Sequence, residues 1–200
     1  MTCSNAWNAN QERVQMLDLD RFIADCCAAR AADRSSKTMC EVVKRAVSDP
    51  AGLLKSLGEP DRAGAREIYR SSGLTILNVV WAPNMMIMPH DHHMWAVIGV
   101  YGGREDNILW RRIGKAGEAQ LEAAGACSLG VRDVHPFGED IVHSVANPTS
   151  RFTGAIHVYG GDLYTAHRSE WDAETLSEQR FDAERARRHF EEANRRHAPS

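Results

Sequence analysis

The chain has 200 residues, of which 43% are hydrophobic and 26% charged, and its formal net charge at pH 7 is −3. This composition suits one globular domain with flanking elements, and the small negative charge predicts no binding to nucleic acid or to an anionic membrane. No apolar run approaches the length of a membrane span, and the first fifteen residues lack the basic start and apolar core of a secretory signal. The five cysteines form no Cys-x-x-Cys pair, which favours reduced thiols in a cytoplasm over a disulfide framework.

Residues 1–60 are expected to form a helical section, because their apolar residues recur at helical spacing. Asp49-Pro50 and Gly58 supply stop signals for two of the helices. We interpret this section as a layer that packs against a sheet and carries no chemistry. The expected helices are a single helix or two short ones over 11–32, then 39–47 and 51–57.

The region 66–167 is expected to form a β-barrel core, since short β-favouring runs alternate with turn signals about every ten residues. Gly102-Gly103 is predicted to be a hairpin turn that follows one long strand over 88–103. A charged helix over 182–197 is expected to close the chain, with Asp182 as its N-cap. The other expected strands are 67–70, 74–81, 107–113, 119–131 and 151–159.

Two histidines in the long predicted strand are the first candidates for chemistry. Residues two apart on a strand point to the same face, so His90 and His92 project together, whereas Asp91 and His93 project away. Two imidazoles on one face offer two adjacent ligands to a divalent metal ion. The same spacing also fits a hydrogen-bonded pair of structural histidines.

A second stretch, 130–148, contains a turn, a short apolar strand with His143, and then Asn147. The two stretches together resemble the paired motifs of the cupin superfamily, whose fold is a double-stranded β-helix or jelly-roll barrel. The first cupin motif gives His-x-His and usually a Glu, and the second gives a Pro-x-Gly turn, a last His and an Asn four residues later. The resemblance implies a mainly β fold, with residues 1–200 as a single cupin domain that has N-terminal helices and a C-terminal helix.

Two departures from the cupin pattern are visible. The distance from Gly138 to His143 is longer than usual, and the Glu position falls on Ala96 or Val97. The missing Glu leaves three neutral histidines (His90, His92 and His143) as the metal ligands. This ligand set resembles that of the thiol dioxygenase branch of the cupins, typified by cysteine dioxygenase.

Further residues agree with this branch over about 68–167, with scattered identities. Trp81 lies nine residues before His90, as a Trp does in that family, and the stretch 155–159 resembles the family's Ser-x-His-x-Tyr. The resemblance implies Fe(II) as cofactor. It also implies oxidation of a small thiol, cysteine or a 3-mercapto acid, to a sulfinic acid with O2.

The resemblance also implies roles for individual residues. His157 and Tyr159 would form a hydrogen-bonded pair whose hydroxyl points at the substrate or O2, although Ala155 replaces the Ser of that relay. The Cys of the family's thioether cross-link falls on Val97, so no cross-link to Tyr159 is expected. Arg70 roughly matches the Arg that binds the substrate carboxylate. Arg104 and Arg168 are weaker candidates, and His135 is expected to lie in a turn.

Other interpretations remain open on the same residues. His157 and Tyr159 also fit a core aromatic beside a surface histidine, and Arg70 fits an exposed rim arginine. Another cupin metalloenzyme is the first alternative function, either a dioxygenase that cleaves carbon–carbon bonds or a non-redox Zn or Mn enzyme. The second is a metal-dependent sensor or small-molecule binding module without turnover. The oligomeric state is not predicted.

Overall fold

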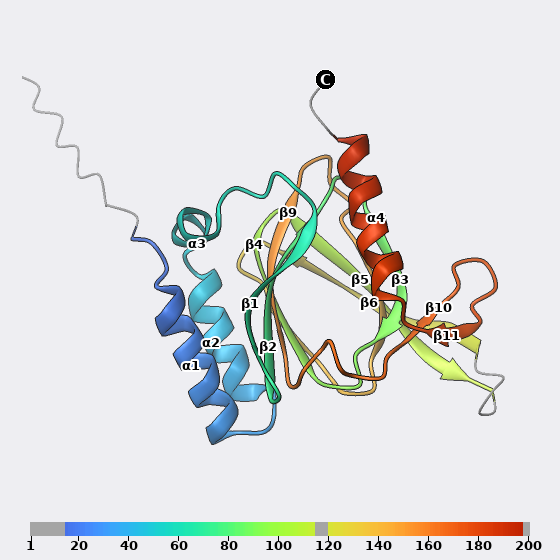
Figure 1. Cartoon of the computed structure of the whole chain (residues 1–200), viewed down its shortest axis with the longest axis horizontal. Coiled ribbons are helices and arrows are strands. Elements are labelled where there is room, and N and C mark those ends of the chain that lie inside the picture. The colour runs from blue at the N-terminus through green and yellow to red at the C-terminus, as the bar shows by residue number, and fades with distance from the viewer. Residues whose placement is uncertain (1–14, 115–119, 198–200) are drawn as a thin grey trace, which may run out of the picture.

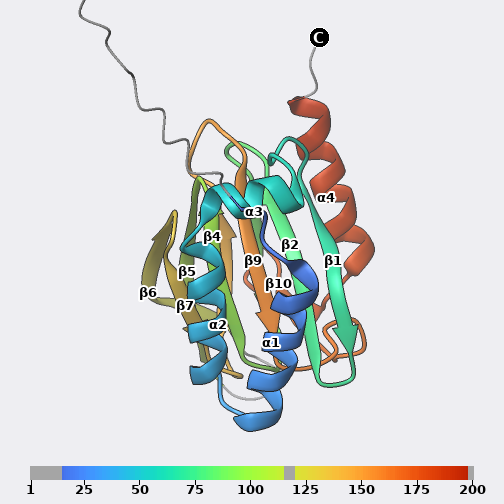
Figure 2. The same ribbon diagram turned by 90° about the vertical axis from the view of Figure 1, so that its left-hand side faces the viewer.

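Two antiparallel β-sheets face each other in the computed structural model, which describes residues 15–114 and 120–197 (Figure 1). Three helices lie over the outer face of one sheet, as Figure 2 shows, and the last helix stands on the opposite side of that sheet. None of the helices in the described ranges has the length and apolar character that a membrane crossing requires. The helices are α1 (Leu19–Ala32), α2 (Lys37–Val47), α3 (Pro50–Leu57) and α4 (Ala183–Arg196).

The five-stranded sheet has the order β1 (Gly64–Ser71), β2 (Leu74–Trp81), β9 (Thr153–Tyr159), β4 (Ala96–Gly102) and β7 (Val134–Phe137). The six-stranded sheet has the order β11 (Glu178–Arg180), β10 (Ser169–Trp171), β3 (Met86–Asp91), β8 (Val142–Ala146), β5 (Arg104–Ile113) and β6 (Gln120–Gly130). From β2 to β10 the chain changes sheet at every connection except the β5–β6 hairpin. This alternation is the winding of a double-stranded β-helix and confirms the predicted cupin-like jelly roll with N-terminal helices and a C-terminal helix.

The prediction of one long strand over 88–103 was wrong. β3 ends at Asp91, β4 begins at Ala96, and the two strands belong to different sheets. His93 turns the chain between them with a φ of 51°, a left-handed conformation that no regular strand contains. The sequence hides this break because β-favouring apolar residues precede the histidines in β3 and follow them in β4.

The predicted hairpin at Gly102-Gly103 was also wrong. β4 pairs with β7 and β9, whereas β5 pairs with β6 and β8, so the turn carries the chain from one sheet to the other. Gly103 has a φ of 78°, and a side chain there would collide with Thr153. Gly103 therefore allows a tight change of sheet, which is a different use of the same turn signal.

The helix predicted over 11–32 begins later than expected. Residues 11–14 lie outside the described ranges, and residues 15–18 are not helical. α1 begins at Leu19 because the Asp18 carboxylate accepts a hydrogen bond from the Arg21 amide, an N-cap that the sequence places inside the acidic stretch 18–20. The hairpin of β10 and β11 was not predicted, since each strand has only three residues.

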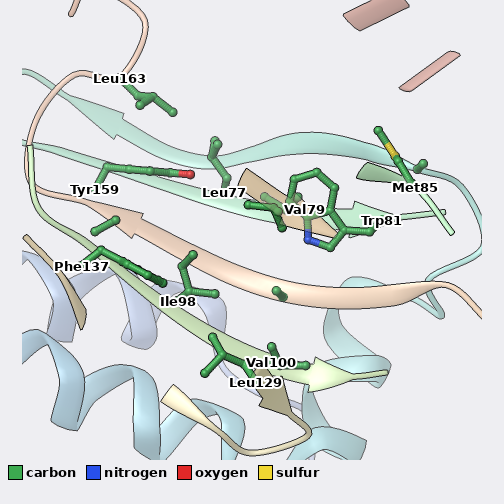
Figure 3. Packing of buried hydrophobic residues seen from close by; sticks show 14 of the residues in the cluster. Leu77, Val79, Trp81, Met85, Ile98, Val100, Leu129, Phe137, Tyr159 and Leu163 are labelled. Carbon is green, nitrogen blue, oxygen red and sulfur yellow. The ribbon is translucent and has the colours of Figure 1, made fainter. Parts of the chain in front are cut away.

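The three central strands of the five-stranded sheet, β2, β9 and β4, are buried on both faces. The inner face of this sheet carries a core that includes Leu77, Val79, Ile98 and Val100, as Figure 3 shows. Its outer face packs against α1, α2 and α3 in a second cluster. Gly99 allows the close approach of α2, because a Cβ at this position would lie 2.5 Å from the Val43 side chain.

Helix α4 bridges the two sheets from outside the barrel. Asn194 exchanges hydrogen bonds of 2.7 and 2.9 Å with the backbone of Ala63, just before β1. His189 bonds the carbonyl of Met86 on β3, and Arg185 pairs with Glu170 on β10 at 2.7 Å. These contacts hold an amphipathic helix over the gap between β1 and β3, where its apolar side faces the barrel interior.

Candidate metal centre

Three histidines meet at the inner face of the six-stranded sheet. His90 on β3 stands opposite His143 on β8 in the strand register, and His92 follows the end of β3 in the segment that crosses between the sheets. All three are buried, and one ring nitrogen from each lies within 4.8 Å of the other two. His90 and His92 therefore project to the same side, as the sequence predicted, although β3 ends at Asp91, between them.

Hydrogen bonds fix the tautomers of two of these rings. His90 Nδ1 lies 2.9 Å from the carbonyl of Met88, and His143 Nδ1 lies 2.7 Å from Oδ1 of Asn107. Both oxygens can only accept, so each Nδ1 carries the hydrogen and each Nε2 keeps a lone pair for a metal ion. His143 Nε2 faces His92 Nε2 at 3.3 Å.

The three histidines fit a divalent cation. The buried Nδ1 of His92 has no hydrogen-bond partner among the described residues, so the polar capacity of this ring is only partly satisfied by protein atoms. Burial lowers the pKa of His90 to about 4 and lowers those of His92 and His143 well below the usual value. The imidazoles are thus neutral at pH 7, the form that ligates metals. This donor set suits Fe(II), Zn, Ni, Cu and Mn and does not choose among them.

The metal-free protein is expected to lose stability as the pH falls from 7 to 5. A histidine with a lowered folded pKa binds fewer protons folded than unfolded, so unfolding is favoured below the unfolded pKa of 6.5. His90 alone should account for about 2 kcal/mol at pH 5. Urea unfolding at both pH values, with a chelator present, measures the effect. His90→Ala should show a shallower pH dependence than the parent, and an unchanged dependence would contradict this explanation.

Glu105 on β5 is a buried acid that the sequence analysis missed. Its Oε2 accepts a hydrogen bond of 2.8 Å from Trp81 Nε1 and lies 3.1 Å from His157 Nε2, while its Oε1 accepts one of 3.1 Å from Asn107 Nδ2. Burial alone would raise its pKa, but the His157 ring and the three hydrogen bonds hold the pKa of this carboxyl below its usual value. Glu105 and Asn107 share the inward face of β5 with Leu109, and polar residues at two successive inward positions were the signal available in the sequence.

His157 and Tyr159 lie together on the inward face of β9. Nδ1 of His157 is 3.1 Å from the Tyr159 hydroxyl oxygen. Because the Glu105 carboxylate accepts from Nε2, a neutral His157 ring accepts the tyrosine hydrogen at Nδ1. The Tyr159 ring packs edge-on against His92 at 4.9 Å, and burial raises the pKa of its hydroxyl. In the Ser-x-His-x-Tyr relay that this stretch resembles, the serine position is Ala155, which cannot form a hydrogen bond through its side chain. Glu105 takes that place here as the hydrogen-bond partner of His157.

A cavity of about 510 Å³ connects these groups with α4. Arg168 is the partly buried cation of its wall near His90, and burial lowers the pKa of this arginine. Within the described ranges no carboxylate lies at ion-pair distance from Arg168, whose guanidinium carbon sits 3.8 Å from the centre of the Phe181 ring. Apolar residues from β2 and α4 complete the wall, among them Leu77, Val79, Ala186 and Phe190.

The other arginines predicted from the sequence lie elsewhere. Arg70 pairs with both oxygens of Asp162 at 3.0 and 2.9 Å and stacks over the ring of Tyr164. It stands behind Tyr164, which lines the cavity, and is not itself part of the wall. Arg104 pairs with Asp106 outside the barrel. The substrate role of Arg70 stays a prediction.

Asn147 and Val97, two residues of the predicted motifs, make structural contacts. Asn147 donates to the carbonyls of Trp81, Ala82 and Arg151, at 3.2, 3.0 and 2.7 Å, and so ties β8 to the end of β2. Val97 packs in the outer cluster, and the β4 residue that pairs with Tyr159 is Ala96. Neither Val97 nor Ala96 offers a sulfur for a cross-link.

Asp91 and His93 form a cluster of their own, since His93 Nε2 lies 3.2 Å from the Asp91 carboxylate. Asp91 also pairs with Arg112 and accepts a hydrogen bond from the Ser169 amide. The prediction that His135 lies in a turn was wrong, because this residue is on β7, where its ring packs against Phe137. Asp91, His93 and His135 are not part of the cavity wall.

Fold and site together define a cupin-like jelly roll with a three-histidine candidate metal centre. No model of a known protein family matches the chain. The DMSP lyase DddQ from Ruegeria pomeroyi is similar over 53% of this chain and 50% of its own, at 18% identity and a TM-score of 0.42. An oxalate oxidase in complex with glycolate is similar over 52% and 53%, at 14% identity and a TM-score of 0.39.

A cupin family protein with a double-stranded β-helix fold from Methanocaldococcus jannaschii is also similar to this chain. The match covers 52% of this chain and 84% of the other, at 10% identity and a TM-score of 0.38. These likenesses concern the fold alone. The chain spans about half the length of the DMSP lyase and oxalate oxidase chains that it matches.

Proposed function

We propose that the protein is an Fe(II)-dependent dioxygenase that oxidises a small thiol acid, of the cysteine or 3-mercapto acid type, to a sulfinic acid with O2. One observation carries this proposal: three neutral imidazoles meet without a carboxylate ligand, and two of them, His90 and His143, line one cavity with a tyrosine–histidine pair and a partly buried arginine. Three facial histidines leave room for two further ligands at once, a thiolate and O2. When bound, the iron would bring these two together so that both oxygen atoms are transferred to sulfur.

The chain's own residues would receive the thiol proton. The Tyr159 oxygen has lone pairs free on its cavity side, because its hydrogen is directed at Nδ1 of His157. A proton accepted there can be balanced by transfer of the tyrosine proton to His157, whose charged form the Glu105 carboxylate stabilises at 3.1 Å. The chain Tyr159, His157, Glu105 therefore supplies a proton path out of the cavity.

Arg168 would bind the acid group of the substrate. A guanidinium presents paired donors that match a carboxylate, and this one is partly buried in the cavity wall, which strengthens its attraction for an incoming carboxylate. The apolar wall from β2 and α4 keeps water from the reacting groups. Arg70 pairs with Asp162 and stacks over Tyr164 outside the cavity wall, so we assign the substrate carboxylate to Arg168 and treat the predicted role of Arg70 as the alternative that the variants below test.

Oxygen consumption by the iron-loaded protein over a panel of thiols tests the proposal. Cysteine or 3-mercaptopropionate should be consumed with one O2 per sulfinate formed, whereas cysteamine, which lacks the carboxylate, should be a poor substrate. Thiol binding without O2 consumption would favour a binding or sensor module. Consumption of O2 with a thiol-free substrate, or full activity with Zn or Mn instead of iron, would favour another cupin metalloenzyme.

Replacing Arg168 by glutamine should lower kcat/KM for the acid thiol by roughly 10–100-fold, the scale for one lost charged hydrogen-bond pair. The rate with cysteamine should change little, because that thiol has no group for the arginine. Arg70→Gln is the matched control and should leave kcat/KM within a few-fold of the parent. The opposite pattern, with the loss in Arg70→Gln alone, would assign the carboxylate to Arg70.

A further inference from the structure

We propose that Glu105 is a positioning residue for the metal: it fixes, through Asn107, the ring tautomer of the ligand His143. This inference rests on the three-histidine metal site of the proposed function but does not depend on the identity of the substrate. Glu105 lies two hydrogen bonds away from His143, on a different strand from every ligand. Its role would therefore be to determine where a proton sits in the metal centre, without contact with the metal.

The first step is the orientation of the Asn107 amide. A carboxylate oxygen can only accept, so Asn107 must turn its NH2 group towards Oε1 of Glu105, at 3.1 Å. Its carbonyl oxygen then faces Nδ1 of His143, at 2.7 Å. Both groups are buried, so no water competes for these positions in the strand. The carboxylate thus decides which end of the amide the histidine meets.

The second step is the tautomer of His143. The Asn107 oxygen accepts the hydrogen of Nδ1, which leaves the lone pair on Nε2, the nitrogen that faces His92 at the centre of the site. A reversed Asn107 amide would present a hydrogen to Nδ1 and move the ring hydrogen to Nε2. In that tautomer the nitrogen at the centre has no lone pair for a metal ion.

Charge at position 105 is needed for this effect, and shape alone is insufficient. A glutamine could still accept from Trp81 and His157, because both donate to the same oxygen, Oε2. Its amide nitrogen would then replace Oε1 and meet the NH2 group of Asn107, donor against donor. Rotation of the Asn107 amide relieves this conflict, because its oxygen then accepts from the glutamine. Its NH2 group then faces Nδ1 of His143.

The experiment uses Glu105→Gln and reads two quantities. Nitrogen NMR of the metal-free protein reports which ring nitrogen of His143 carries hydrogen, and titration with Zn²⁺ against a competing chelator gives the metal dissociation constant. We expect hydrogen on Nδ1 in the parent and on Nε2 in the variant, with metal affinity lowered roughly 10–100-fold, the usual effect of a lost outer contact. Asp106→Asn, which removes a neighbouring carboxylate outside the barrel, should change neither.

A compensating variant separates this role from a general structural one. In Glu105→Gln with Asn107→Asp, the glutamine NH2 donates to the new carboxylate, which again accepts the Nδ1 hydrogen of His143. The parent tautomer and a metal affinity within a few-fold of the parent should return. Failure of the double variant to recover either one, while both variants stay folded, would overturn the proposal.

Hydrogen on Nε2 of His143 in the parent would overturn it directly, even if every variant failed to fold. Unchanged tautomer and affinity in Glu105→Gln would also overturn it, while leaving the thiol dioxygenase proposal intact. If the iron-loaded parent oxidised no thiol, while the tautomer change and its rescue were observed, the thiol dioxygenase proposal would fail and the role of Glu105 would stand. The two proposals can therefore fail separately.

Discussion

His143→Ala should leave the protein unable to retain iron. The two remaining imidazoles are neutral and buried, so no negative charge on them attracts the cation and compensates for the lost ligand. Affinity should fall by more than the roughly 10–100-fold that outer contacts are worth, and turnover should disappear with the metal. Iron content per chain after anaerobic reconstitution and desalting measures this. The same loss is expected for His90→Ala and His92→Ala.

His93→Asn is the matched control for these variants. His93 adjoins a ligand, but its ring points to Asp91 and is half exposed. Asparagine tolerates the left-handed backbone at this position better than alanine does. Iron content should match the parent. Full iron content in His143→Ala would remove the second motif from the site, and iron loss in His93→Asn would show that the crossing segment, rather than the ligands, governs binding.

Tyr159→Phe should lower turnover by a factor of roughly ten to a thousand while iron content stays the same. The substitution keeps the ring that packs on His92 and removes only the hydroxyl bonded to His157. The proton path towards Glu105 would then begin at a residue that cannot accept a proton. O2 uptake per iron, measured with the same thiol and matched metal content, gives the effect.

Tyr101→Phe provides the comparison, because it also removes a buried hydroxyl. The Tyr101 hydroxyl donates to Asn78 at 2.8 Å, in the cluster on the outer face of the five-stranded sheet. This variant should lose about 1 kcal/mol of stability without a change in turnover. Equal turnover in Tyr159→Phe and the parent would exclude Tyr159 from the chemistry and weaken the thiol dioxygenase proposal, while the three-histidine site would stand.

Features that depend on short-range patterns were predictable from the sequence. The period of two along β9 is enough to place His157 and Tyr159 on one face, and the spacing of apolar residues in α2 is enough to define its buried side. Asp182 was expected as an N-cap and accepts hydrogen bonds from the amides of Glu184 and Arg185. The three histidines were found as parts of two motifs, since no local rule relates His92 to His143.

Features that depend on pairing between distant strands were not predictable. The break after Asp91 is hidden because β-favouring apolar residues stand on both sides of the histidines, whichever sheet contains them. Glu105 gains its role only when β5 lies beside β8 and faces β9, which brings Asn107 to His143 and Glu105 to His157. Arg168 reaches the cavity through a loop after β9 whose path no periodicity describes.

The position of α4 at the end of the described chain bears on the order in which the protein is made. Every residue of the metal centre and its hydrogen-bonded surroundings, from Trp81 to Tyr159, leaves the ribosome before residue 183. The wall that Phe190 and its neighbours contribute is synthesised afterwards. Chain order therefore lets the residues around the three histidines come together before the last helix can cover this side of the barrel.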